Sequence, residues 1–259
     1  MDVARQPARR VLGAALSVAT LMPFIAGLPD AGAAVAKTIH PGVAVNYGDV
    51  TCTVGAVLRA GHRVFLAVPA SCGGIALGKA DQDGCSSPQT PVGSPVSIQG
   101  AKHRGRLVYS SHSQMQLRGD VNPSRCYYND LALVRVNRHD RARVSAAIPG
   151  VGVPSRVVAK LPSNGSALRV GATSAEAGAT HRNGWELDLS SPTAMWKKAD
   201  CGSPVTIGKR LVGMLLVLPK GPIPGAPVAQ AAAQTYNLSR AIKYLRTTPH
   251  FHHAHVVRR

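Results

Sequence analysis

The chain has 259 residues, of which 45% are hydrophobic and only 4% aromatic, and its formal net charge is +18. A chain of this length buries a full core, either as one large β domain or as two small lobes. The positive charges are scattered rather than gathered in a stripe, and aromatic residues for base stacking are scarce, so we expect no nucleic-acid partner. High charge favours anionic partners, and it also serves simply to keep a protein soluble.

The N-terminal segment, residues 1–36, has the layout of a secretory signal peptide. Three arginines precede an apolar stretch over residues 11–28, and small-residue cleavage patterns follow at residues 31–33 and 34–36. The alternative is a retained membrane anchor, for which 18 apolar residues are only marginally long enough. We expect cleavage and a secreted or envelope-associated protein with no stable membrane span. Its mature chain then starts near Lys37 with a net charge of +17, because three Arg and two Asp are removed.

The first half of the mature chain reads as short antiparallel strands. Residues 51–59 alternate between apolar and polar, residues 60–62 turn the chain, and residues 63–68 return as an apolar strand. His62 lies in this hairpin turn, so we expect it to be a solvated residue rather than a ligand. Further segments are expected as a loop over 79–95, strands over 95–99 and 105–111, a polar excursion over 113–125, and a strand over 130–136.

The second half begins after a polar and then Gly/Pro-rich connector over residues 137–154, and it repeats the pattern of short strands. They are expected at 156–160, 167–170, 185–189, 205–207, 211–218 and 226–233, with Asn-Gly hairpin turns at 164–165 and 183–184. Residues 238–246 form the one clear helix, with Asn237 or Ser239 as its cap. The tail over 250–259 is rich in His and Arg; its four histidines suit a metal ion, but in a terminal segment we expect no metal site.

An exported chain can hold disulfides, and this chain has five cysteines: Cys52, Cys72, Cys85, Cys126 and Cys201. Two bridges and one thiol is the natural sum, but the count alone leaves fifteen arrangements open. No Cys-x-x-Cys pair is present, which argues against a zinc knuckle or a thioredoxin-type site. We therefore expect neither a metal nor a cofactor.

Three local patterns occur in a fixed order along the chain. They are a hairpin flanked by Cys52 and Cys72, the strand start Asn129-Asp-Leu-Ala-Leu133, and the turn Asp200-Cys-Gly-Ser-Pro-Val205. Together they resemble the trypsin-like (chymotrypsin-fold) serine proteases, especially the secreted bacterial ones. The resemblance covers roughly residues 40–247. It implies an all-β domain over 37–249, built as two six-stranded antiparallel barrels, at about 40–136 and 155–247, with a C-terminal helix.

The resemblance also assigns site positions. Cys201 stands at the position of the nucleophilic serine, and Ala199 at the first glycine, whose backbone N–H helps to hold the oxyanion. Asp130 stands at the aspartate that orients the catalytic histidine, but alignment on Cys72 places Ser71 at the histidine itself. A buried Asp130 would therefore need another partner, such as the Ser71 hydroxyl or backbone N–H groups. Two plainer interpretations remain, in which Asp130 is a turn residue before a strand and Cys201 a small buried residue in a tight loop.

The pairing of the cysteines follows from the same comparison. In the family two half-cystines close the first hairpin, so Cys52 and Cys72 are expected to pair, and Cys85 then pairs with Cys126 as the remaining half-cystines of the first half. Cys201 stays a thiol.

The implied function depends on which catalytic groups remain. The mechanism needs a nucleophile, a base, an orienting aspartate and two oxyanion donors, and only Asp130 is unchanged here. We therefore expect an inactive protease homologue that acts as a binding or envelope-associated module. Its expected partners are a peptide or protein ligand and anionic cell-envelope polymers. The alternative is an active peptide hydrolase that uses Cys201 with an unrecognised base.

Overall fold

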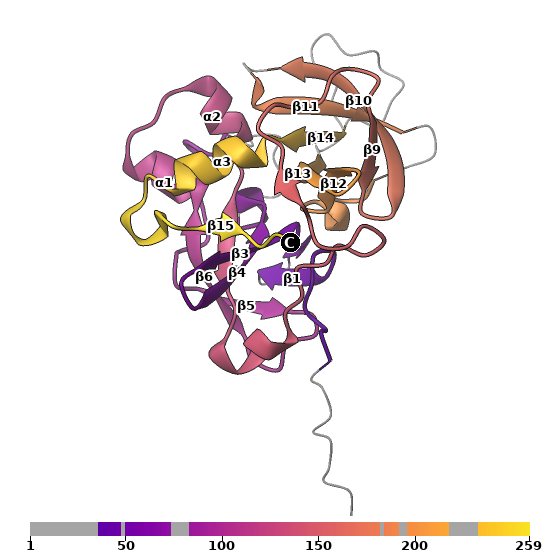
Figure 1. The fold of residues 1–259 in the computed structure, drawn as a ribbon. Coiled ribbons are helices and arrows are strands. Elements are labelled where there is room, and N and C mark those ends of the chain that lie inside the picture. Colours follow the sequence, from indigo (N-terminus) through magenta and orange to yellow (C-terminus); the bar gives the residue numbers. More distant parts are fainter. Residues whose placement is uncertain (1–35, 48–49, 74–82, 182–183, 192–195, 218–232) are drawn as a thin grey trace, which may run out of the picture. The chain divides into compact units, whose positions relative to one another are not determined.

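The computed structural model describes residues 36–47, 50–73, 83–181, 184–191, 196–217 and 233–259, all within one compact unit, Val35–Arg259. The predicted signal segment lies outside these residues except for Ala36, and so does most of the strand predicted over 226–233. Within the described residues, no helix combines the length and apolar character that a membrane crossing needs. β-strands make up most of the regular secondary structure in these residues (Figure 1).

The first half of the unit folds into an open sheet of eight strands. Its order is β15-β3-β4-β7-β6-β5-β1-β2, and each neighbouring pair is antiparallel. The strands are β1 (Ala44–Tyr47), β2 (Val50–Thr53), β3 (Ala56–Ala60), β4 (Arg63–Val68), β5 (Pro95–Ile98), β6 (Gly105–Ser110), β7 (Ala132–Arg135) and β15 (His255–Val256). This sheet forms a half-barrel rather than the closed six-stranded barrel that the sequence predicts.

The hairpin of this sheet differs from the prediction in one respect. Residues 51–59 were expected as one strand, but the chain bends at Val54 and Gly55, which separates β2 from β3. Gly55 packs so closely against the Met214 side chain that a Cβ at this position would clash with it. β3 then pairs with β4, and His62 lies exposed in the turn between them, as predicted.

The second half closes into a six-stranded barrel. The order β12-β9-β10-β11-β14-β13 is completed by pairing of β12 with β13, and β8 lies parallel to β13 on its outer side. The strands are β8 (Arg156–Val157), β9 (Ala167–Val170), β10 (Thr173–His181), β11 (Glu186–Ser190), β12 (Pro204–Ile207), β13 (Arg210–Val217) and β14 (Ala233–Tyr236). The all-β fold predicted from the sequence is thus confirmed, with one closed barrel and one half-barrel.

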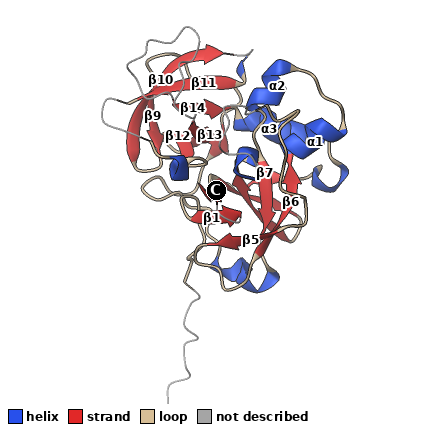
Figure 2. Ribbon diagram, turned by 180° about the vertical axis from the view of Figure 1, so that it is seen from behind, coloured by secondary structure: helices blue, strands red, loops and turns tan. Residues whose placement is uncertain are grey.

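Within the described ranges, three short α-helices accompany the sheets: α1 (Ser111–Leu117), α2 (Pro123–Tyr128) and α3 (Leu238–Leu245) (Figure 2). The C-terminal helix α3 is confirmed, and its cap is Asn237, whose side chain accepts a hydrogen bond from the backbone N–H of Arg240. The polar excursion predicted over 113–125 contains helical residues: 113–117 belong to α1 and 123–125 to α2. Both begin at side-chain caps, Ser110 and Asn122, but are too short to show apolar periodicity.

The last ten residues pack onto the half-barrel. Phe251 is buried and lies edge-on to the rings of Phe65 and Tyr109, and β15 pairs with β3. Phe251 is the last residue of the short 3₁₀ helix η5 (Pro249–Phe251), which precedes β15 in the chain. The segment that the sequence sets apart as a His/Arg-rich tail therefore adds both a core side chain and an edge strand to the first half.

The larger hydrophobic core extends beyond the half-barrel. It includes the buried residues of β3, β4 and β7, and it also takes in Cys201, Met214, Leu216 and Tyr236 from the second half of the chain. A second cluster fills the closed barrel. The turn that carries Cys201 thus lies where the second half of the chain packs against the first.

Candidate functional site

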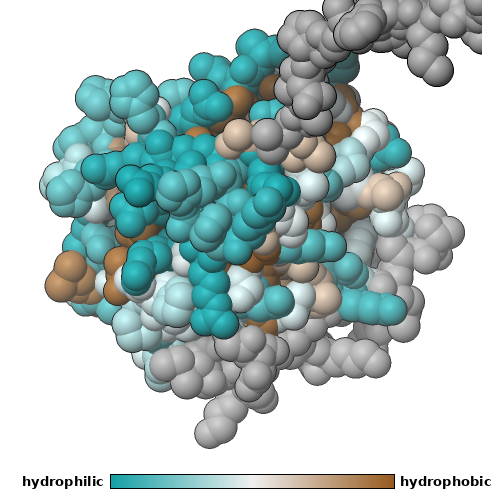
Figure 3. Space-filling view, turned by 90° about the horizontal axis from the view of Figure 1, so that it is seen from below, coloured by the Kyte–Doolittle hydropathy of each residue, from teal (hydrophilic) through white to brown (hydrophobic). Residues whose placement is uncertain are grey.

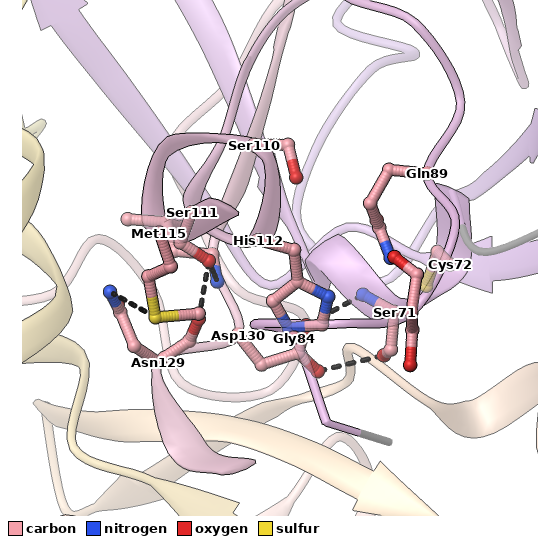
Figure 4. Close-up of polar contacts among 12 residues, drawn as sticks. Ser71, Cys72, Gly84, Gln89, Ser110, Ser111, His112, Met115, Asn129 and Asp130 are labelled. Carbon is pink, nitrogen blue, oxygen red and sulfur yellow. Dashed lines mark hydrogen bonds and ion pairs between the residues drawn. The ribbon is translucent and has the colours of Figure 1, made fainter. Parts of the chain in front are cut away.

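Asp130 lies two residues before β7 and is buried, with its side chain 3% exposed. Its carboxylate accepts a hydrogen bond from the Ser71 backbone N–H at 2.6 Å and another from the Ser71 hydroxyl at 2.7 Å (Figure 4). Ser71 is part of the short 3₁₀ helix η1 (Ala70–Gly73) that follows β4. Ser71 is therefore the hydrogen-bond partner that a buried Asp130 was expected to need, and it contributes both its hydroxyl and its backbone N–H.

The second partner of Asp130 is a histidine that the sequence analysis did not single out. His112 lies in α1 with its side chain 2% exposed, and its Nε2 is 3.4 Å from Oδ1 of Asp130 (Figure 4). Gly84 packs against this ring so closely that a Cβ there would clash with it. Burial lowers the pKa of His112, although the nearby carboxylates of Asp130 and Asp83 oppose this effect. His112 is therefore neutral near pH 7 and lies buried beside the carboxylate.

Cys201 follows the one-turn 3₁₀ helix η4 (Lys198–Asp200) and is 9% exposed. Strand β2 holds this turn in place through Thr53. The backbone N–H of Thr53 donates to the Cys201 carbonyl at 2.8 Å, and its hydroxyl donates to the Ala199 carbonyl at 2.9 Å. Asp200 closes the turn on itself, because its carboxylate accepts the Lys197 backbone N–H at 2.7 Å.

Gly202 explains why the turn needs a glycine after the cysteine. Its φ is +98°, a backbone conformation that L side chains rarely adopt, and an added Cβ would clash with the carbonyl oxygen of Thr53. Its own N–H donates to the Leu215 carbonyl at 2.8 Å, which ties the turn to β13. The turn is therefore fixed to β2 on one side and to β13 on the other.

Both predicted disulfides are present. Cys52 is joined to Cys72, and Cys85 to Cys126, while Cys201 stays outside both bridges. Two groups of potential metal ligands occur in the described part of the chain: one unites Cys201 with the Cys52–Cys72 bridge, and the other unites Asp83 with the Cys85–Cys126 bridge. A disulfide sulfur is no thiolate ligand, so neither group suits a metal while its bridge is intact.

These contacts limit the chemistry that the site can perform. The Ser71 hydroxyl donates its proton to a carboxylate, so it has no basic function to offer a nucleophile. Tyr236 is buried in the same core, and its pKa is raised by burial first, and then by electrostatic interaction with Asp130 and Cys201. This phenol is therefore neutral at physiological pH. Of the residues singled out from the sequence, Ser71 and Asp130 are hydrogen-bonded to each other. Ala199 and Cys201 lie in one turn, and both of their carbonyls accept hydrogen bonds from Thr53.

The fold defined by the closed barrel, the half-barrel and the C-terminal helix is that of chymotrypsin-type serine proteases. Three solved structures are similar to the chain with TM-scores of 0.50. Thermobifida fusca protease A shares 14% identity over 85% of this chain and 99% of its own. Nocardiopsis protease shares 15% sequence identity over 84% of this chain and 98% of its own. Cellulomonas bogoriensis chymotrypsin shares 14% identity over 85% of this chain and 99% of its own.

At these identities the similarity establishes the fold alone. No protein-family model matches the chain, and no curated protein gives a significant match.

Proposed function

We propose that this chain is an exported chymotrypsin-fold protein without peptidase activity, which acts as a binding module. The observation that carries the proposal is the pair of hydrogen bonds from Ser71 to Asp130. In the resembling proteases this carboxylate orients a histidine that takes the proton of the nucleophile. Here Ser71, at the histidine position, donates its hydroxyl and its backbone N–H to the same carboxylate and so offers no base, while the other partner of Asp130, His112, is buried in α1.

The loss of the base decides the rate. An unassisted thiol is only a few per cent thiolate at pH 7, and removal of the histidine from a working triad costs about a million-fold in turnover. Ala199 adds to the loss, because the family has glycine at this position of the oxyanion turn. The carbonyl of Ala199 is also held by Thr53. Peptide turnover is accordingly expected to fall below ordinary detection.

Export and an anionic partner are supported by other features. Two disulfides suit an oxidising compartment. At one end of the half-barrel, the buried Asp140 accepts the backbone N–H groups of Lys102 and His103, which joins the loop of the exposed Lys102 and Arg104 to η2 (Arg138–Arg143), where Arg138 is exposed. Figure 3 views this end of the molecule, and hydrophilic residues cover much of that face. This basic end is our candidate surface for anionic cell-envelope polymers.

The catalytic part of the proposal is tested with the purified mature chain and a diverse peptide library. We expect no cleavage and no burst labelling by fluorophosphonates. Slow alkylation of Cys201 by iodoacetamide does not count as activity. Specific cleavage that disappears in Cys201→Ala would instead establish the alternative, a cysteine hydrolase with an unrecognised base.

The binding part is tested by retention on an anionic matrix. We expect retention to fall as salt rises from about 0.05 to 0.5 M, because screening weakens exposed charges. A triple substitution to Gln at Lys102, Arg104 and Arg138 should elute at lower salt than the native chain. The matched control removes three exposed charges elsewhere, at Arg156, Lys160 and Lys209. Equal loss of retention in both variants would contradict a defined surface at the basic end.

A further inference from the structure

Three sulfur atoms meet beside the candidate site. Cys52 in β2 and Cys72 in η1 form a disulfide, and the Sγ atom of Cys201 lies with both of theirs in a group whose members are all within 4.8 Å of one another. Cys201 belongs to neither bridge. A thiol and a disulfide are therefore neighbours inside one folded unit, although Cys201 is far from both partners in the sequence.

The backbone fixes this neighbourhood. Thr53, the residue after Cys52, donates its N–H to the Cys201 carbonyl at 2.8 Å and its hydroxyl to the Ala199 carbonyl at 2.9 Å. Gly202 lies so close to the Thr53 carbonyl that β2 and the Cys201 turn are in direct backbone contact. Cys201 is thus attached to the strand that carries Cys52. Cys72 is held separately, because η1 is fixed through the bonds of Ser71 to Asp130.

We propose that Cys201 exchanges with the Cys52–Cys72 disulfide, so that the chain interconverts between this bridge and a Cys52–Cys201 bridge. The Cys201 thiol, 9% exposed, gives its proton to water. The thiolate attacks Sγ of Cys52, the new S–S bond forms, and the bond from Cys52 to Cys72 breaks. The sulfur of Cys72 leaves as a thiolate and takes up a proton. The exchange is redox-neutral, because one thiol and one disulfide are present before and after it, and it needs no outside oxidant or reductant.

The hydrogen bonds of Thr53 to the Cys201 turn favour attack on Cys52 over attack on Cys72. Cys52 and Cys201 belong to segments that stay hydrogen-bonded through Thr53 in either form. The exchanged form joins β2 covalently to the Cys201 turn and releases η1 from its covalent tie, so that Ser71 is then held by Asp130 alone. This device goes beyond the proposed binding function and does not depend on it, because it involves neither a peptide nor an anionic polymer.

The test maps thiols in the native chain. The protein is held at about pH 8, quenched in acid, unfolded, labelled with N-ethylmaleimide at about pH 5 where exchange is slow, and digested without reduction. We expect label on both Cys201 and Cys72, and peptides linked as Cys52–Cys72 and Cys52–Cys201, in a ratio unchanged by dilution of the protein. Label on Cys201 alone, with Cys52–Cys72 as the sole bridge to Cys52, overturns the proposal.

Three variants sharpen the result. Cys201→Ser should abolish the label on Cys72. Cys72→Ser, treated with oxidised glutathione as the two-electron oxidant, should form the Cys52–Cys201 bridge. The matched control, Cys126→Ser, leaves Cys85 without its disulfide partner and should give label on Cys85 in addition to the label on Cys201 and Cys72. A Cys85–Cys201 bridge in that control would indicate general scrambling and overturn the assignment. Labelled Cys52 and Cys201 in folded Cys72→Ser after treatment with oxidised glutathione would also overturn it.

Discussion

The buried His112 makes a testable contribution to the pH dependence of stability. Its pKa in the folded chain lies below the usual value of 6.5, and the ring regains that value on unfolding. Below about pH 6.5 the unfolded chain therefore binds more protons, so the free energy of unfolding falls as the pH falls. If the ring stays neutral in the fold, the loss between pH 7 and pH 5 is about 2 kcal/mol. A typical domain has only about 5–15 kcal/mol of stability.

The assay is denaturant unfolding at pH 7, 6 and 5, with both disulfides intact. His112→Gln keeps a polar side chain beside Asp130 but removes the titrating group, so its free energy of unfolding should lose most of this pH dependence, whatever its absolute stability. The control is His62→Gln, which changes an exposed turn residue and should leave the native slope intact. An unchanged slope in His112→Gln would refute the reasoning.

Three further outcomes are expected. Gly202→Ala combines a positive φ with a clash at the Thr53 carbonyl, so it should cost about 3 kcal/mol in denaturant unfolding or prevent folding, whereas Gly61→Ala, which has open space, should cost about 1 kcal/mol. Phe251→Ala removes a buried ring from the half-barrel core and should lower the free energy of unfolding by about 3–5 kcal/mol. N-terminal sequencing of the exported protein should begin close to Ala34 or Lys37, and an intact Met1 on membrane-embedded protein would contradict cleavage.

The fold was accessible from the sequence because its signals are local and ordered. Each of the three motifs, at Cys52–Cys72, at Asp130 and at Cys201, is a short stretch whose residue types follow from a turn or a strand start. Their joint order carries the topology that no single one specifies. The requirement for a partner at Asp130 was also accessible, because the cost of an unpaired buried carboxylate holds in any fold.

The contact between His112 and Asp130 was not accessible in the same way. It depends on how α1 packs after β6, a long-range arrangement, and a histidine in a short polar helix gives no apolar period to read. The cap at Ser110 was the one usable signal for the helix itself. The docking of Phe251 onto Phe65 and Tyr109 is likewise long-range, so the sequence shows a charged tail where the structure has a core contact.

The central proposal is that the chain has no peptidase activity, and the pH profile of Cys201 alkylation tests most directly whether a base activates this thiol. The rate of iodoacetamide labelling is followed on the peptide that contains Cys201, from about pH 5 to pH 10, in the native chain. An unassisted thiol gives one ionisation, with a rate still rising through about pH 8–9. We predict that profile. A rate already at its plateau near about pH 6–7, with a second ionisation that disappears when a histidine is replaced, would contradict the account.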